Sequence, residues 1–309
     1  MLYDVLVIGG GPAGLTAGLY TSRLGLKSVL VEGGIFGGQM VNARLIENYP
    51  GFPEGISGFD LAALMHDQAS KFGLETVTAD VTGIEPGRNH RVVTDEVTYE
   101  STAVVLAAGS DYRKLNVPGE EAYIGRGISY CATCDGPLYR DETVAVVGGG
   151  DTAVSDALEL AEHASKVFLI HRRDQLRASQ VLQQRVLSHP KVEPLWSTVV
   201  EGLSGDSLIE AIRLRNVISG DLIELPLAGL FVAIGFVPRT QLFSHVLDLT
   251  ETGQVRTDTT LATSVRGIFA AGDIRMNSSR QIAGAVGDGA LAALSAFRYV
   301  REIVGQSQV

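Results

Sequence analysis

The sequence predicts an α/β protein with two parallel-sheet domains, one inserted into the other. A short apolar strand runs into a glycine-rich turn and then a helix near the N-terminus, at residues 2–20. The same order recurs at residues 143–160, and a third glycine-ended strand returns near residue 270. A chain of 309 residues is long enough for two domains that each bury a core.

The composition is that of a soluble globular chain, with 45% hydrophobic and 19% charged residues. A formal net charge of −10 argues against non-specific nucleic-acid binding. No apolar run is long enough to span a bilayer. The start, Met1 to Asp4, lacks the basic region of a signal peptide, so we expect a cytoplasmic protein.

The first glycine-rich turn has every part of a dinucleotide-binding fingerprint. A β-branched and apolar strand, Leu2 to Ile8, leads into Gly9-Gly10-Gly11-Pro12-Ala13-Gly14. After a helix, a second strand ends at Glu32, 18 residues beyond Gly14. Glycines let a pyrophosphate approach the helix N-terminus, and the acid accepts hydrogen bonds from a ribose. The alternative is a plain glycine-rich turn.

The second copy differs from the first at the end of its second strand. Thr143 to Val147 leads into Gly148-Gly149-Gly150-Asp151-Thr152-Ala153, and the next strand is Lys166 to Ile170. Where the first copy carries an acid, this one carries His171, followed by Arg172 and Arg173, with Arg177 one turn later. Arginines in place of a ribose-binding acid suit a 2′-phosphate, which predicts NADP(H). The alternative is a solvated basic cluster.

Two different dinucleotide sites in one chain imply electron transfer between them. The acid-bearing site suits FAD, whose ADP moiety has no 2′-phosphate. The chain returns to the first domain at Gly267 to Asp273, followed by a Gly- and Ala-rich stretch from Arg280 to Ala296. Turns at Pro118-Gly119 and at residues 235–238 mark the crossings. We therefore expect an FAD domain at residues 1–114 and 242–309, and an NADPH domain at residues 115–241.

The two cysteines of the chain, Cys131 and Cys134, form a C-x-x-C pair inside the predicted NADPH domain. This spacing allows a small disulfide whose thiolate form attacks other disulfides. A structural zinc site needs four ligands, and the chain has no other cysteine. An inert buried pair is the other alternative. Asp135 is placed to act as a general acid, although Asp before Gly is also an ordinary turn.

The combination Cys-Ala-Thr-Cys-Asp, Gly-Gly-Gly-Pro-Ala-Gly, His-Arg-Arg and Ala-Ala-Gly-Asp ahead of Arg280-Gln281 resembles the low-molecular-weight, bacterial-type thioredoxin reductases. The resemblance covers nearly the whole chain in the right order. It implies two Rossmann-like domains of the three-layer ββα type, with the NADPH domain inserted into a discontinuous FAD domain. It also implies a homodimer that reduces thioredoxin.

The resemblance assigns roles to individual residues. Cys134 is the sulfur nearest the flavin, Cys131 attacks the partner disulfide, and the NADPH domain rotates between half-reactions. The implied FAD contacts are Gly9, Gly11, Pro12, Ala13, Gly14, Glu32, Gly38, Gln39, Asn48, Val81, Gly109, Asp273, Arg280, Gln281 and Ile282. The implied NADPH contacts are Gly150, Asp151, Thr152, His171, Arg172, Arg173 and Arg177. The chain departs from the family pattern at Ser155 and Ser279.

Several related functions compete with this interpretation. A peroxidase reductase carries an additional N-terminal thioredoxin-like region, and a ferredoxin–NADP reductase lacks the cysteine pair. A non-enzymatic redox sensor would bind the nucleotides without turnover. The acceptor is also open, because a glutaredoxin-like protein or a specialised thioredoxin needs the same chemistry.

Overall fold

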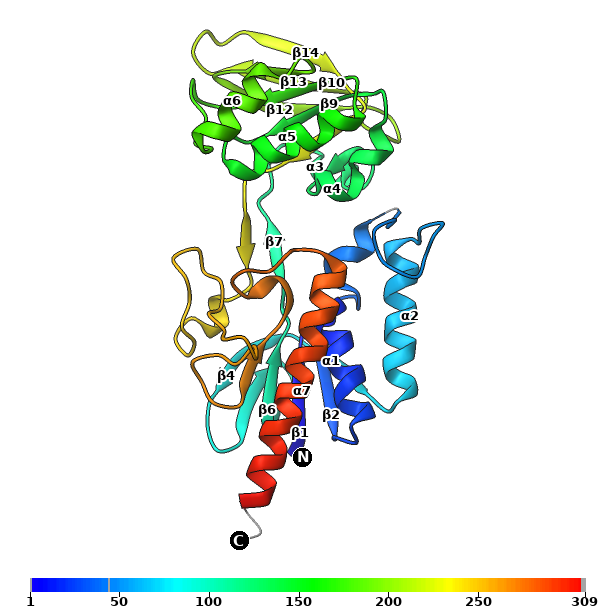
Figure 1. Ribbon diagram of the computed structural model, residues 1–309, viewed down its shortest axis with the longest axis vertical. Helices are drawn as coiled ribbons and strands as arrows, with labels where there is room; N and C mark the ends of the chain where they lie inside the picture. The colour runs from blue at the N-terminus through cyan, green and yellow to red at the C-terminus, as the bar shows by residue number, and fades with distance from the viewer. Residues whose placement is uncertain (1, 44, 307–309) are drawn as a thin grey trace. The chain divides into compact units, whose positions relative to one another are not determined.

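The computed structural model describes residues 2–43 and 45–306, which form two compact units (Figure 1). The first unit comprises Met1–Asp111 and Val237–Val309, and the second comprises Tyr112–Phe236. Both are α/β with parallel sheets, and the second is inserted into the first, so the predicted fold class is confirmed. No helix in the described ranges is long and apolar enough to cross a membrane.

The first unit is built on a seven-stranded sheet in the order β3-β2-β1-β6-β5-β4, with β17 added to β6. Its strands are β1 (Leu2–Ile8), β2 (Ser28–Glu32), β3 (Glu75–Thr78), β4 (Val81–Glu85), β5 (His90–Thr94), β6 (Thr98–Leu106) and β17 (Ile268–Ala270). The long strand β6 pairs with β1 on one side and has two partners on the other. Its start pairs antiparallel with β5, and its end pairs parallel with β17. The C-terminal return of the chain is thereby fixed beside the first glycine loop.

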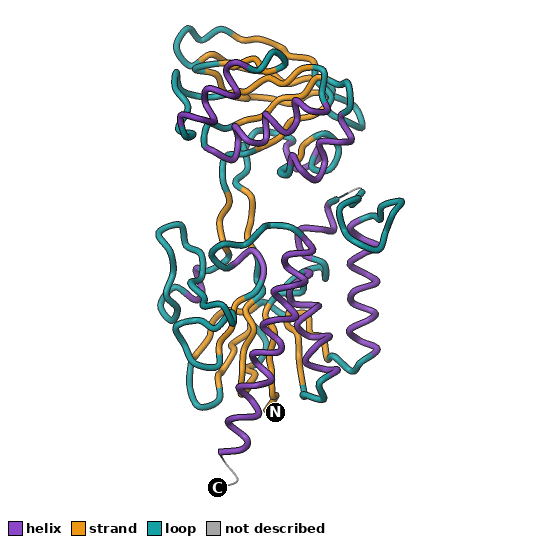
Figure 2. The backbone as a smooth tube through the Cα atoms, in the orientation of Figure 1, coloured by secondary structure: helices purple, strands orange, loops and turns teal. Residues whose placement is uncertain are grey.

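Helices cover one face of this sheet (Figure 2). They are α1 (Pro12–Arg23), α2 (Gly58–Lys71) and α7 (Ile282–Gln306). The first unit also contains the short turns η1 (Gly38–Asn42), η3 (Gln241–Phe243) and η4 (Gly272–Ile274). Helix α7 packs closely on α1: a Cβ added at Gly289 would lie 2.2 Å from the carbonyl oxygen of Ala13. A second apolar cluster, with Phe243 and Leu247, fills the opposite face.

The second unit has three layers. A parallel sheet, β11-β10-β9-β15-β8, is formed by β8 (Ile128–Ser129), β9 (Thr143–Val147), β10 (Lys166–Ile170), β11 (Val192–Leu195) and β15 (Gly229–Val232). An antiparallel sheet comprises β12 (Thr198–Ser204), β13 (Ala211–Asn216) and β14 (Leu222–Pro226). The helical elements are α3 (Glu120–Tyr123), α4 (Ala132–Asp135), η2 (Gly136–Tyr139), α5 (Asp151–His163) and α6 (Gln180–Ser188). One apolar cluster lies between the sheets, and another lies under α5.

The chain passes between the units along two short strands, β7 (Ser110–Tyr112) and β16 (Phe236–Pro238), which pair with each other. The unit boundaries therefore fall inside this ribbon, at 111/112 and 236/237. The sequence-based boundaries, at 114/115 and 241/242, lie a few residues further along at both crossings. The Pro118-Gly119 turn that suggested the first crossing belongs to the second unit.

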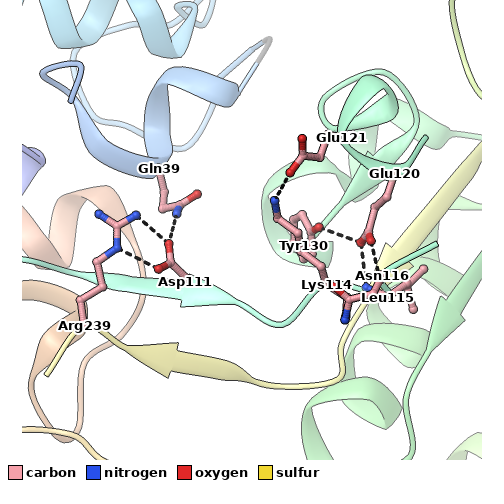
Figure 3. Close-up of polar contacts among 9 residues, drawn as sticks. All are labelled: Gln39, Asp111, Lys114, Leu115, Asn116, Glu120, Glu121, Tyr130 and Arg239. Atoms are coloured by element: carbon pink, nitrogen blue, oxygen red, sulfur yellow. Dashed lines mark hydrogen bonds and ion pairs between the residues drawn. The ribbon is translucent and has the colours of Figure 1, made fainter. Parts of the chain in front are cut away.

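An ion pair joins β7 to the residue that directly follows β16, within the first unit (Figure 3). Nε and Nη2 of Arg239 donate to the two carboxylate oxygens of Asp111, at 2.9 and 2.8 Å. Nε2 of Gln39 donates to the same carboxylate at 3.2 Å. We name this group, Gln39, Asp111 and Arg239, the linker base.

Candidate functional site

The first glycine loop, Gly9 to Gly11, lies between β1 and α1. Gly9 has φ +103°, and a Cβ there would lie 2.4 Å from the carbonyl oxygen of Ala107. Pro12 begins α1, whose first turn has no side-chain cap, so its backbone N–H groups remain available to an anion. A Cβ at Gly11 would meet only Cα of Gly38, at 3.9 Å, so the loop is open on that side.

Glu32 stands at the end of β2, directly beside this loop. Its Oε2 accepts a hydrogen bond from the N–H of Gly10 at 2.6 Å, and its Oε1 accepts one from the N–H of Gly34 at 2.9 Å. A carboxylate bound by two backbone donors fixes the loop to the strand end. The residue expected to bind a ribose therefore also braces the loop.

The remaining FAD contacts implied by resemblance all lie in the first unit. Nδ2 of Asn48 donates to Oε1 of Gln281 at 3.2 Å, which joins two segments far apart in sequence. Asp273 lies in η4, and a Cβ at Gly272 would lie 3.0 Å from Cβ of Ala13. Burial raises the pKa of Asp273, and a hydrogen bond from Oγ of Ser278 partly offsets this rise.

The other residues of the implied FAD set lie elsewhere in the first unit. Gly38 begins η1, and a Cβ there would lie 3.2 Å from Cα of Gly11. Gly109 follows β6 with φ +69° and open space around it, and Val81 begins β4. Arg280 directly precedes Gln281 and Ile282, where α7 begins. Gln39 is engaged in the linker base.

The second glycine loop, Gly148 to Gly150, repeats this arrangement between β9 and α5. A Cβ at Gly150 would meet nothing within 4 Å, so this position is also open. Asp151 begins α5, and its Oδ1 accepts a hydrogen bond from the N–H of Ser179 at 2.7 Å. Thr152 is exposed beside it. The N–H of Arg177 donates to the carbonyl oxygen of Gly149 at 2.6 Å, which draws the basic segment onto the loop.

His171 occupies the strand-end position that Glu32 holds in the first loop. Its side chain is buried against Gly149, where a Cβ would lie 2.2 Å from the imidazole ring. Burial lowers the pKa of His171, and the charges of Arg177 and Arg173 lower it further. Arg172, Arg173 and Arg177 are exposed. The structure thus brings the predicted basic cluster and the second loop together.

Cys131 and Cys134 form a disulfide in the turn that opens α4, which we name the redox turn (residues 129–136). Sγ of Cys131 accepts a hydrogen bond from the N–H of Cys134 at 3.2 Å. Both cysteines are half-buried. Oγ of Ser129, a residue not singled out from the sequence, accepts the N–H of Cys131 at 3.1 Å.

Asp135 is half-buried at the end of α4. Burial raises the pKa of its carboxyl group, and a hydrogen bond with Ser129 partly offsets the rise. A raised pKa is what a proton donor near neutral pH requires. The redox turn packs on α5, since a Cβ at Gly136 would lie 3.3 Å from the side chain of Leu160.

Comparison with known proteins identifies this arrangement. The pyridine nucleotide-disulphide oxidoreductase family matches residues 3–289. Thioredoxin reductase from Listeria innocua is 43% identical over 304 residues, covering 98% of this chain and 95% of that protein. The chain belongs to the pyridine nucleotide-disulphide oxidoreductases and, within them, to the thioredoxin reductases.

Solved structures of this family agree with that placement. The crystal structure of Streptococcus pyogenes thioredoxin reductase is 42% identical, has a TM-score of 0.94, and covers 97% of this chain and 99% of its own. A structure of Lactococcus lactis thioredoxin reductase, described as its FR conformation, is 41% identical with the same coverage. Its TM-score is 0.67.

The residues of both loops fit the two cofactors of the family, FAD and NADPH. In the first unit an open loop, an uncapped helix N-terminus and Asp273 offer donors and acceptors to a flavin dinucleotide. In the second, Nε2 of His171 is buried without a hydrogen-bond partner among the described residues. That atom lies against the loop beside the exposed arginines, which suits a phosphate-bearing nucleotide.

Proposed function

We propose that this chain is an NADPH-dependent reductase of protein disulfides, with thioredoxin as its substrate. The observation that carries the proposal is a C-x-x-C disulfide on the same unit as a glycine loop flanked by exposed arginines. The reaction converts NADPH, a proton and a disulfide to NADP⁺ and a dithiol. When bound, FAD supplies a ring system that accepts a hydride from NADPH and delivers the electron pair to a disulfide.

The chain's own residues divide the remaining work. Gly9 to Gly14 and Glu32 hold the flavin dinucleotide, with the other residues assigned above around them. Gly150 to Thr152 and the His171 to Arg177 segment hold NADPH. We assign Cys131 as the thiolate that attacks the partner disulfide, and Cys134 as its resolving partner nearest the flavin. Asp135, with its raised pKa, protonates the departing thiolate.

The second unit must present two different groups to the flavin, which supports rotation about the linkers. The second glycine loop lies at the N-terminus of α5, whereas the redox turn packs near Leu160. Leu160 is nine residues beyond Asp151, about 14 Å along a helix.

The cysteine pair provides the main test. Cys131→Ser and Cys134→Ser should each bind FAD and accept electrons from NADPH, yet reduce no protein disulfide. Flavin absorbance under anaerobic NADPH titration measures the first step, and thioredoxin reduction measures the second. Full retention of thioredoxin reduction by either variant would refute the proposed function.

The identity of the partner needs its own experiment. We expect the NADPH-reduced holoenzyme to be reoxidised by a thioredoxin and not by a glutaredoxin-like protein. We further propose a homodimer in the cytoplasm, where a reducing environment suits a chain whose two cysteines form one redox pair. Light scattering of the holoenzyme at about twice 32.8 kDa checks the assembly.

A further inference from the structure

The redox turn is attached to the linker by an aromatic stack. Tyr130 directly precedes Cys131, and its ring stacks on Tyr112 of linker strand β7. The ring centroids are 4.8 Å apart and the planes differ by 14°. Both tyrosines belong to the second unit. Residues 18 apart in sequence are therefore in contact where the linker enters this unit and where the redox turn begins.

A buried carboxylate completes the attachment (Figure 3). Oε1 of Glu120 accepts hydrogen bonds from the N–H of Leu115 at 2.9 Å and the hydroxyl of Tyr130 at 3.1 Å. Oε2 accepts the N–H of Asn116 at 2.8 Å. Glu120 is only 3% exposed, so its carboxylate depends on these donors for the hydrogen bonds that water would otherwise supply.

We propose that Glu120, acting through Tyr130, is a positioning residue that fixes the redox turn to the linker. The inference rests on the proposed function, since it concerns delivery of electrons to the Cys131–Cys134 disulfide. Glu120 contacts neither sulfur in the hydrogen bonds it makes. Its effect passes through Tyr130 to the adjacent cysteine.

The surrounding structure shows why such a device is needed. Strand β8, which leads into Tyr130, has only two residues paired with β15. Beyond this short ladder, the redox turn is held by its packing on α5 and by the contacts of Tyr130. The chain enters the second unit at Tyr112, so any rotation about the linker moves Cys131 according to how firmly the turn is attached there. Asn116, whose N–H donates to Glu120, has φ +60°, a left-handed conformation that asparagine adopts more readily than most residues.

The hydroxyl group of Tyr130 must stay protonated to donate its hydrogen bond to Glu120. Burial raises its pKa, and the negative charge of Glu120 raises it further. The hydroxyl group therefore stays protonated throughout the pH range in which the enzyme would work.

The test compares Glu120→Gln and Tyr130→Phe with Glu121→Gln in the FAD-loaded full-length protein. Glu121 is the neighbouring acid, exposed and paired with Lys114. We expect kcat for thioredoxin reduction to fall about tenfold in the first two variants, because small misplacements of reacting groups cost this much or more. The KM for NADPH and the rate of NADPH-dependent ferricyanide reduction, which bypasses the disulfide, should stay unchanged. Glu121→Gln should match the wild type in every assay.

Hydrogen exchange and a double variant give readouts independent of turnover. Glu120→Gln should speed amide exchange at Leu115 and Asn116, and both single variants should speed it at Cys131. The double variant should lose no more than the worse single variant, because both changes break one chain of contacts. Equal loss of ferricyanide and thioredoxin reduction would instead mark a general structural role and overturn the proposal.

Two further outcomes are decisive. If Glu120→Gln fails to fold, Tyr130→Phe still tests the proposal, since it removes one hydroxyl and keeps the stack. Thioredoxin turnover within twofold of the wild type in Tyr130→Phe, with unchanged exchange at Cys131, overturns it. A wild-type protein that reduces no protein disulfide is a different result, because that outcome refutes the proposed function itself.

Discussion

The two glycine loops have the same backbone design but use opposite chemistry at the strand end. In the first loop, both carboxylate oxygens of Glu32 accept backbone hydrogen bonds from Gly10 and Gly34. In the second, the buried ring of His171 packs on Gly149, and the carbonyl oxygen of Gly149 accepts the N–H of Arg177. The first loop is braced by a charge, and the second by packing and a backbone contact.

In the first loop one residue both braces the loop and recognises the nucleotide. In the second loop different residues perform these two roles. Glu32 is both the brace of its loop and the group expected to recognise a ribose. In the second loop His171 braces, while the exposed guanidinium groups of Arg172 and Arg173 are free of that task. Substitutions at the first strand end should therefore disturb stability and cofactor binding together. Substitutions at the second strand end should change either stability or cofactor binding, and not both together.

The largest effect is expected where the shared backbone design is broken. In Gly14→Ala the new Cβ would lie 1.8 Å from the carbonyl oxygen of Gly9, a backbone atom that cannot move aside. We expect a loss of about 3 kcal/mol or more in the free energy of unfolding, with little FAD retained after purification. Gly150→Ala in the second loop, with open space around its Cβ, is the matched control and should fold normally. Wild-type stability of Gly14→Ala in chemical denaturation would contradict the close contact.

Removing the selecting charges of the second loop should give the next largest effect. Arg172→Ala combined with Arg173→Ala should raise the KM for NADPH about 100-fold, because each lost charged hydrogen bond costs about 1.5 kcal/mol or more. The KM for NADH and the melting temperature should hardly change. Steady-state kinetics with both nucleotides measures the split. An equal rise for NADPH and NADH would show that the arginines do not read a 2′-phosphate.

Removing the charge from the first strand end should affect both properties at once. Glu32→Gln keeps the shape of the side chain but replaces one acceptor oxygen with an NH₂ group, which faces an N–H donor. We expect the free energy of unfolding to fall by about 2 kcal/mol, together with weaker FAD binding. Glu54→Gln, at an exposed acid, is the control. Weaker FAD binding at unchanged stability would show that the brace and the selector are separable here too.

Local sequence patterns were sufficient to predict much of this arrangement. The predicted strands Leu2 to Ile8, Thr143 to Val147 and Lys166 to Ile170 coincide with β1, β9 and β10, because buried parallel strands are continuous β-branched and apolar runs. The Gly- and Ala-rich stretch from Arg280 to Ala296 falls almost entirely in α7, Ile282–Gln306. Arg280 has φ +53°, which is incompatible with an α-helix, and the helix continues beyond the Gly- and Ala-rich part.

Tertiary contacts determined the rest. Glu120 and Glu121 are identical neighbours after a glycine, and nothing local distinguishes them. Only the folded chain shows that Glu120 is buried against the linker while Glu121 is exposed beside Lys114. The antiparallel pairing of β6 with β5 also gave no local signal, since the first half of β6 is polar. Contacts between residues far apart in sequence leave no periodic signal.

The smallest effect expected is a pH dependence that belongs to the second loop. Burial holds the pKa of folded His171 below its ordinary value of 6.5, so the unfolded chain binds a proton that the folded chain refuses. Stability is therefore complete above pH 6.5 and falls as the pH drops from there toward the lower folded-state pKa. His171→Gln should remove this part of the decline, which for a single group is at most about 1.4 kcal/mol per pH unit.

The first unit carries a buried histidine of its own, which makes the assignment testable. Burial also lowers the pKa of His90, so it contributes a decline of the same sign, unrelated to either loop. Urea unfolding between pH 5 and 7.5 gives the unfolding free energy as a function of pH. The slope of this pH dependence should become partly less steep in His171→Gln and in His90→Gln, and should not change in His245→Gln at an exposed site. Both buried substitutions also lower stability at every pH, so the slopes are compared rather than the absolute values. An unchanged slope in His171→Gln would mean that the second loop is braced by packing alone, without the titrating group that distinguishes it from the first.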